Sequence, residues 1–300
     1  EFFFIDNLNF RINKNILKKK KVNLIISKSG NTLETISNSS IILNKKDENI
    51  FIVENKNNYL LKLANKLKAE IVHHNNYIGG RYSVLSEVGM LPSALMGLEI
   101  KKFRKFNNLI KNKRFLNAIV KNVANQLEFI KKKKNNSIIL NYDEKSIDLF
   151  NWYQQLMAES LGKNNTGVLP IISSMPKDNH SMMQYYLDGP KNYFFTFFIV
   201  KEKYSQKLSN KNILNSRNYL KNKSFRDIIF SQFTATQKVF KKKKIPFRTF
   251  VINNRDEETL GELFTFFILE VILLGKFMKN NPFNQPEVEL IKSETNKLLI

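Results

Sequence analysis

A glycine pair directly before an arginine is the first feature of this sequence that could do chemistry. Gly79 and Gly80 precede Arg81 in residues 79–89, which read Gly-Gly-Arg-Tyr-Ser-Val-Leu-Ser-Glu-Val-Gly. Glycine allows a backbone to approach a ligand closely, and the arginine guanidinium keeps its charge at physiological pH. The segment therefore predicts a contact with an anionic group of a ligand.

A second segment combines hydroxyl groups, a lysine and a glycine turn. Residues 27–35 read Ser-Lys-Ser-Gly-Asn-Thr-Leu-Glu-Thr, and they lie between an apolar run and a helical pattern. Hydroxyls and backbone N–H groups at the start of a helix, with a lysine beside them, suit a phosphate monoester. Taken alone, the pattern also fits a helix that is simply capped by serine or threonine.

Two residues in the second half of the chain could transfer protons. Glu159 lies near the end of an amphipathic stretch that starts at about Ile147, and Gly162 can form the C-terminal cap of that helix. A carboxylate can move a proton between neighbouring sugar carbons, and the imidazole of His180 can give and accept a proton near neutral pH. Taken alone, a glutamate at such a position is usually just solvated, and a lone histidine is more often structural than catalytic.

Several segments, in this order along the chain, resemble signatures of the phosphoglucose isomerase family, which interconverts glucose 6-phosphate and fructose 6-phosphate. They are residues 27–35, 79–89 and 159–163 (Glu-Ser-Leu-Gly-Lys), and residues 281–292 (Asn-Pro-Phe-Asn-Gln-Pro-Glu-Val-Glu-Leu-Ile-Lys). The His-Ser-x-x-Gln spacing at residues 180–184 resembles the short bacterial members. The family has an aspartate and two glycines where this chain has Asn284, Glu287 and Ile291.

The resemblance implies a cofactor-free, metal-free aldose–ketose isomerase of glycolysis and gluconeogenesis that works through an enediolate. It implies that Glu159 carries the proton between C1 and C2, that Arg81 stabilises the enediolate, and that His180 and Lys292 open the sugar ring. It assigns the substrate phosphate to Ser27, Lys28, Ser29, Thr32 and Gln285. It also implies a homodimer in which His180 enters the active site of the neighbouring subunit.

Two other functions remain open. A dual phosphoglucose and phosphomannose isomerase is possible, because the choice of C2 epimer depends on pocket details. A sugar-phosphate-binding protein impaired in catalysis would fit the altered residues 284–291. It would also fit the absence of the family's Gly-x-Gly-Gly-Ser loop, since Gly79-Gly80 is the only adjacent glycine pair. Because the sequence begins at Glu1, directly before an expected strand, we expect the N-terminal part of the first domain to be missing from it.

Composition excludes several classes of protein. The absence of cysteine rules out disulfides and thiolate zinc sites, and it fits a reducing cytoplasm. Three histidines disfavour a histidine-rich metal site, and His73 and His74 match no motif, so we interpret them as surface or packing residues. The longest apolar stretch, residues 263–274, contains Glu270 and is shorter than the ~20 residues that cross a bilayer, so it predicts a buried helix.

A net charge of +23 raises nucleic acid as a partner, since lysine runs occur at residues 18–21, 131–134 and 241–244. Only eight of the 49 basic residues are arginines, whereas nucleic-acid recognition favours the arginine fork. Each run ends an expected helix, where cations complement the carbonyl end of the helix dipole. We therefore expect solvated helix ends that attract an anionic substrate, and neither a nucleic-acid nor a membrane partner.

Short apolar runs alternate with longer amphipathic stretches, as in parallel strands joined by helices. Predicted strands cover residues 2–5, 22–27, 50–53, 70–72 (an edge strand), 137–141, 168–173, 193–200 and 247–252. Predicted helices between the first strands cover residues 10–19, 33–43 and 57–67. The pattern, together with the resemblance, predicts two three-layer α/β/α domains of the sugar-isomerase type with parallel sheets. They are residues 1–98, incomplete at the N-terminus, and residues 99–300, which end in a C-terminal helix.

Overall fold

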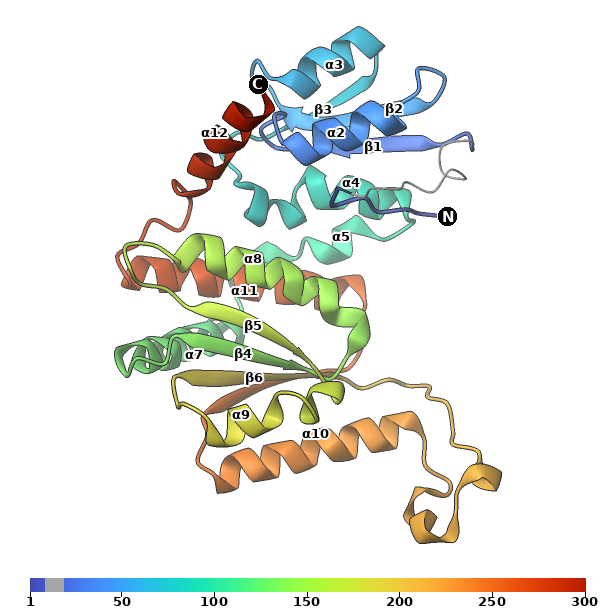
Figure 1. The fold of residues 1–300 in the computed structure, drawn as a ribbon, viewed down its shortest axis with the longest axis vertical. Helices are drawn as coiled ribbons and strands as arrows, with labels where there is room; N and C mark the ends of the chain where they lie inside the picture. The colour runs from blue at the N-terminus through green and yellow to red at the C-terminus, as the bar shows by residue number, and fades with distance from the viewer. Residues whose placement is uncertain (9–18) are drawn as a thin grey trace. The chain divides into compact units, whose positions relative to one another are not determined.

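Two compact units make up the protein in a computed structural model that describes residues 1–8 and 19–300. The first unit is Glu1–Arg104 and the second is Lys105–Ile300. Each unit contains its own parallel β-sheet (Figure 1). The predicted α/β class is confirmed, while the helix predicted at residues 10–19 falls, apart from its last residue, outside the described residues.

The first unit has a three-stranded parallel sheet in the order β1-β2-β3. The strands are β1 (Val22–Ile26), β2 (Glu48–Glu54) and β3 (Glu70–His74), and the helices between them are α2 (Leu33–Ile42) and α3 (Tyr59–Leu67). These elements lie where the sequence predicts them, and β3 is an edge strand. Because all strands are parallel, the segments after Ile26, Glu54 and His74 meet at one edge of the sheet.

A short 3-10 helix, η1 (Gly80–Leu85), follows β3 and leads into α4 (Glu87–Leu95) and α5 (Ile100–Phe103). Helix α4 packs on η1 and β3. A Cβ atom at Gly89 would lie 2.0 Å from the carbonyl oxygen of Val84, so this approach requires glycine. The end of the Gly-Gly-Arg segment is therefore built around close backbone packing.

The strand predicted at residues 2–5 is wrong. These residues have no regular secondary structure, and Phe4 is 76% exposed. An apolar run becomes a strand only where a neighbour supplies hydrogen bonds and a packed face covers its side chains. Among the described residues of this unit, the paired strands are β1 with β2 and β2 with β3, so residues 2–5 have no neighbouring strand.

The second unit has a four-stranded parallel sheet in the order β5-β4-β6-β7. The strands are β4 (Asn136–Asn141), β5 (Leu169–Ser174), β6 (Tyr193–Val200) and β7 (Phe247–Ile252). All four were expected from the sequence. Every residue of β6 is buried, which is typical of a strand covered on both faces.

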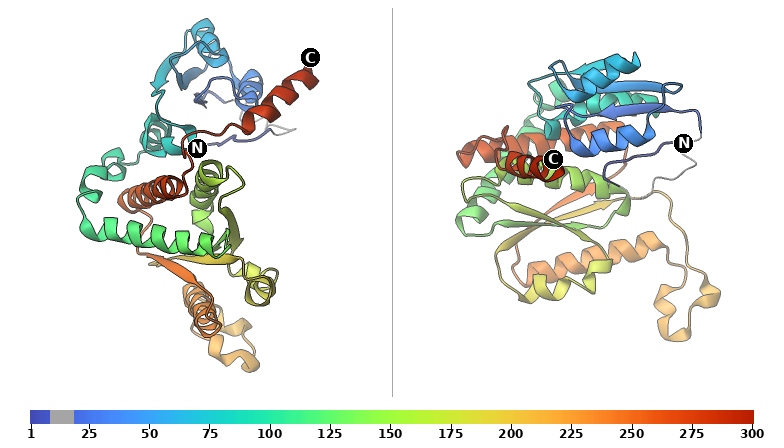
Figure 2. Two further views of the ribbon diagram at one scale, coloured as in Figure 1. Left: turned by 90° about the vertical axis from the view of Figure 1, so that its left-hand side faces the viewer. Right: turned by 45° about the horizontal axis from the view of Figure 1, so that its top comes forward.

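Helices cover both faces of this sheet (Figures 1 and 2). On one face lie α7 (Lys113–Lys131), α8 (Ile147–Leu161) and α11 (Glu257–Phe277), and on the other lie α9 (Met183–Asp188) and α10 (Phe225–Lys242). Phe198 of β6 packs on Phe150 of α8. The preceding residue, Phe197, points to the opposite face of the sheet and packs on Phe240 of α10. Alternate side chains of β6 thus hold the three layers together.

The remaining elements of this unit are short or peripheral. They are α6 (Phe106–Leu109), η2 (Glu144–Ser146), η3 (Lys177–Asn179), η4 (Asn210–Asn212), η5 (Asn215–Leu220) and α12 (Val288–Leu299). Helix α12 buries none of its side chains.

Helix ends and apolar helices follow the sequence pattern. Helix α7 ends at Lys131 and α10 at Lys242, so two of the three lysine runs end helices as predicted, and the third begins outside the described residues. The apolar stretch at residues 263–274 lies in α11, whose buried side chains include Leu263 and Leu274. No helix in the described part of the chain is long and apolar enough to span a membrane.

Candidate active site

The predicted phosphate loop lies at the carboxyl edge of the first sheet. Ser27 follows β1 and is buried, and its Oγ lies 2.9 Å from Oγ1 of Thr32. Thr32 is the N-cap residue of α2, yet its hydroxyl makes no capping hydrogen bond. The Ser29 hydroxyl accepts the N–H of Asn31 at 3.3 Å. The structure thus brings Ser27, Ser29 and Thr32 into one turn at the positive end of a helix.

Gly30 forms the turn and has φ +64°. Its N–H donates to the carbonyl of Ser27 at 3.2 Å. A Cβ at this position would lie 1.9 Å from Oδ1 of Asn58, an atom that accepts the N–H of Leu61 at 2.8 Å and so caps α3. Both the backbone conformation and the close contact therefore require glycine.

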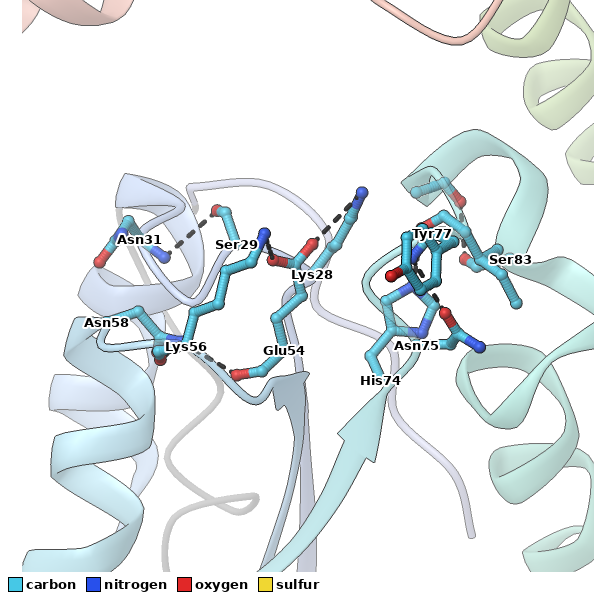
Figure 3. Close-up of polar contacts among 12 residues, drawn as sticks. Lys28, Ser29, Asn31, Glu54, Lys56, Asn58, His74, Asn75, Tyr77 and Ser83 are labelled. Atoms are coloured by element: carbon cyan, nitrogen blue, oxygen red, sulfur yellow. Dashed lines mark hydrogen bonds and ion pairs between the residues drawn. The ribbon is translucent and has the colours of Figure 1, made fainter.

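The loop lysine, Lys28, is held by the carboxylate of Glu54, which is not among the residues predicted from the sequence. Nζ of Lys28 lies 3.2 Å from one oxygen of Glu54, and Nζ of Lys56 lies 3.2 Å from the other (Figure 3). Glu54 ends β2, the strand next to β1, so the register of parallel strands places it beside the loop. Two lysines share one carboxylate, so the cluster stays net positive and suited to an anion.

Arg81 lies in η1 and is only 4% exposed. Its guanidinium stands over the ring of Tyr82, 5.4 Å from the centroid. The segment is braced from within, because the hydroxyl of Ser83 donates to the carbonyl of Gly80 at 2.6 Å and that of Ser86 donates to the carbonyl of Ser83 at 2.7 Å. These hydrogen bonds hold the short helix in one conformation, so the position of the Arg81 guanidinium is well defined.

Glu159 lies in the last turn of α8 and is half-buried. Its Oε1 accepts a hydrogen bond from Nε2 of Gln155 at 2.9 Å. Gly162 forms the C-cap as predicted, and its N–H donates to the carbonyl of Ala158 at 3.0 Å. Its φ of −75° shows that the cap is not left-handed. Gly162 nevertheless matters for space, since a Cβ there would lie 2.9 Å from that same carbonyl oxygen.

The glutamate turn is joined to the Asn-Pro-Phe-Asn segment. Lys163 donates from Nζ to the carbonyl of Asn281 and, at 3.0 Å, to Oδ1 of Asn284. Asn280 donates from Nδ2 to the carbonyl of Leu161 at 3.2 Å. The structure therefore brings together residues 159–163 and 280–284, directly before Gln285. Lys163 and Asn280 were not among the predicted site residues, although Lys163 is the last residue of the Glu-Ser-Leu-Gly-Lys motif.

His180 is exposed and forms the C-cap of η3, the short 3-10 helix in the loop that follows β5. Its loop is anchored by Asp178, whose carboxylate accepts hydrogen bonds from the Ser173 hydroxyl, the Ser174 N–H and the Ser181 hydroxyl at 2.8, 2.8 and 2.9 Å. Burial raises the pKa of Asp178, but these hydrogen bonds outweigh it and hold the pKa below its ordinary value. The loop therefore has a charged anchor near neutral pH.

Glu159 and His180 of one chain lie at opposite edges of the second sheet. Helix α8 runs back from the carboxyl edge of the sheet (Figure 1). Glu159, in its last turn, therefore precedes the start of β5, whereas His180 follows the end of β5. Six residues of β5 separate the two edges, a span of about 17 Å at roughly 3.3 Å per residue. The structure does not bring these two side chains together within one chain.

Lys292 lies on the exposed helix α12, where its Nζ is 2.6 Å from Oε1 of Glu289. Ile291, at a usual glycine position of the family signature, is 71% exposed. Lys292 therefore lies on a solvent-exposed helix, paired with a carboxylate of the same helix. Among the described residues, no group of three or more metal-ligating side chains is arranged to hold a metal ion.

Comparisons with known proteins agree with the motifs. The family model described as phosphoglucose isomerase matches residues 5–175. The glucose-6-phosphate isomerase of Methanocaldococcus jannaschii is 32% identical over 96% of this chain and 75% of its own length.

Two crystal structures share the fold. A hypothetical protein of Thermus thermophilus has a TM-score of 0.84 at 23% identity, over 95% of this chain and 74% of its own. A glucose-6-phosphate isomerase of Chlamydia trachomatis has a TM-score of 0.69 at 18% identity, over 92% of this chain and 58% of its own. The chain belongs to the phosphoglucose isomerase family.

Proposed function

We propose that this protein interconverts glucose 6-phosphate and fructose 6-phosphate through an enediolate. Family membership supports the reaction, and the turn at residues 27–32 is the observation that carries the substrate class. The Thr32 hydroxyl does not cap its own helix, although it stands at the N-cap position. A helix N-terminus with two neighbouring hydroxyls and a lysine suits a phosphate monoester better than it suits any neutral group.

In this mechanism, Glu159 moves the proton between C1 and C2. A single carboxylate on one face of the enediolate can accept the proton from one carbon and return it to the other. The hydrogen bond from Gln155 orients the carboxylate and leaves it acceptor capacity. Arg81, which is buried and always charged, stabilises the negative oxygens of the enediolate. Gln285 adds a contact to the phosphate.

His180 and Lys292 open the sugar ring, and His180 acts in the site of a neighbouring subunit. The separation of His180 from Glu159 along β5 supports a homodimer, because one chain does not bring both groups to one sugar. Lys292 takes part by leaving Glu289, which costs little because exposed ion pairs contribute less than about 1 kcal/mol. We further propose that the enzyme works in the cytoplasm, in glycolysis and gluconeogenesis, without cofactor or metal.

The first test is the Glu159→Gln variant in a coupled assay on fructose 6-phosphate. Removing the proton carrier should lower kcat by about 10²–10⁴-fold and leave KM within about threefold, because the phosphate loop is untouched. Glu128→Gln, an exposed glutamate of α7, is the matched control and should behave as the parent. A Glu159→Gln protein as active as its parent would contradict the mechanism.

The same assay separates the other two functions. Turnover of mannose 6-phosphate at a comparable kcat/KM would identify a dual isomerase. Calorimetric binding of fructose 6-phosphate without any turnover by the parent protein would identify an impaired sugar-phosphate-binding protein instead.

A further inference from the structure

His74 is a buried histidine with two polar partners, and none of the roles above uses it. It ends β3 and is 2% exposed, whereas its neighbour His73 is exposed. Its Nε2 lies 3.0 Å from the carbonyl oxygen of Ile78, and its Nδ1 is hydrogen-bonded to Oε1 of Glu87. Figure 3 shows His74 at the end of its strand, close to Asn75 and Tyr77.

The two partners flank the segment that carries Arg81. Ile78 directly precedes Gly79, and Glu87 is the first residue of α4. One imidazole ring therefore joins both ends of residues 79–86. The N–H of Asn75 also approaches Oε1 of Glu87, at 3.3 Å, so the end of β3 holds this carboxylate twice.

Both partners of His74 carry acceptor oxygens: the carbonyl of Ile78 lies against one ring nitrogen and the carboxylate of Glu87 against the other. Burial raises the pKa of Glu87, but its own backbone N–H and His74 outweigh this effect, so the pKa lies below its ordinary value. The first turn of α4 also favours a negative charge.

We propose that His74 is a positioning residue for Arg81: by joining Ile78 to Glu87 it holds η1 in the geometry that catalysis needs. This inference rests on the proposed enediolate role of Arg81. The internal hydrogen bonds of the segment, such as that from Ser83 to Gly80, shape the turn, whereas the two hydrogen bonds of His74 tie the ends of the segment to β3.

The test compares His74→Leu with His73→Leu, the adjacent and exposed residue of the same strand. His74→Leu should lower kcat by about 10–100-fold, since small displacements of a catalytic group cost up to about 10²-fold. KM for fructose 6-phosphate should stay within about threefold, because the loop at residues 27–32 is not touched. His73→Leu should match the parent in both quantities.

A double-mutant cycle with Arg81→Ala separates positioning from mere stability. If His74 acts through Arg81, adding His74→Leu to Arg81→Ala should lower kcat no further. Equal losses in both backgrounds, measured well below the melting temperature of each variant, would overturn the inference. Glu87→Gln is the second variant should His74→Leu not fold, and it should reproduce the kcat loss with KM unchanged.

The kcat values of these variants distinguish the catalytic role of Arg81 from the positioning role of His74. If Arg81→Ala alone keeps full kcat, the catalytic role of Arg81 is wrong and the inference falls with it. If Arg81→Ala is impaired while both His74→Leu and Glu87→Gln turn over like the parent, only the positioning role of His74 is wrong.

Discussion

At the scale of single residues, Thr32 shows how one hydroxyl separates two interpretations of a motif. The sequence allows either a capped helix or a phosphate loop at this position. In the structure the hydroxyl pairs with that of Ser27 at 2.9 Å and does not cap α2. The capping interpretation therefore does not account for Thr32, whereas its role as a phosphate ligand stays a prediction.

Gly30 offers a residue-scale test of that loop. Gly30→Ala introduces a Cβ 1.9 Å from Oδ1 of Asn58 at φ +64°, so the loop must shift. We expect a loss of about 1–3 kcal/mol in the free energy of unfolding, and a KM for fructose 6-phosphate raised several-fold because the phosphate ligands move.

Gly97→Ala is the matched control for Gly30→Ala. Gly97 also has a positive φ, +82°, but a Cβ there meets nothing within 4 Å. It should lower stability through backbone strain alone and leave KM unchanged. Urea unfolding and steady-state kinetics measure both quantities, and equal KM values for the two variants would contradict the loop assignment.

At the scale of elements, a buried ion pair joins β7 to the helices on one face of the second sheet. Arg248 donates to Glu270 of α11, with Nη2 3.2 Å from Oε2, and to the hydroxyl of Tyr153 of α8 at 3.1 Å. Burial is the main cause that raises the pKa of Tyr153, so its phenol stays protonated and donates to Glu270 at 2.9 Å. Three elements thus share one satisfied polar cluster.

Breaking this pair should be costly. Glu270→Leu leaves the Arg248 charge buried without its carboxylate, and we expect a loss of about 3–5 kcal/mol in the free energy of unfolding. The double variant Arg248→Met, Glu270→Leu should recover most of the loss, because no uncompensated charge remains. Urea unfolding of both variants measures this, and a double variant that is no more stable than Glu270→Leu would contradict the account.

At the scale of the whole molecule, the site depends on residues that lie far apart in sequence. The compact units divide after Arg104, and the domain boundary expected after residue 98 stays a prediction. Within the second unit, the parallel sheet holds Glu159 and His180 at opposite edges. The proposed homodimer, in which His180 serves the neighbouring site, would resolve this separation.

Hybrid dimers test that arrangement directly. Glu159→Gln and His180→Ala proteins should each be nearly inactive, but subunit exchange between them creates dimers with one intact site. With random exchange, half of the dimers are mixed, so about a quarter of the parent activity should return. Mixing Glu159→Gln with Glu159→Ala is the control and should restore nothing. If mixed dimers form by mass spectrometry without regained activity, His180 does not act in the neighbouring site.

Much of the fold could be predicted from local patterns. Strands β6 and β7 lie at the predicted residues 193–200 and 247–252. In β6 the reason is an uninterrupted run of aromatic and β-branched residues, which favours a buried strand wherever a sheet can accept it. The strand predicted at residues 2–5 is wrong for the opposite reason. The run is as apolar as a strand, but pairing depends on a neighbour that the run does not encode.

The sequence by itself determined the order of elements, the family signatures and the residues expected to do chemistry, since these depend on residue type and short spacing. Only the tertiary structure decided which side chains meet. It placed Glu54 on Lys28, Lys163 on Asn284, and His74 between the two ends of the Arg81 segment. The physical reason is that such contacts follow from strand register and from packing between elements. Apart from His74 and Ile78, these partners lie 13 to 121 positions apart in sequence, and no local pattern encodes them.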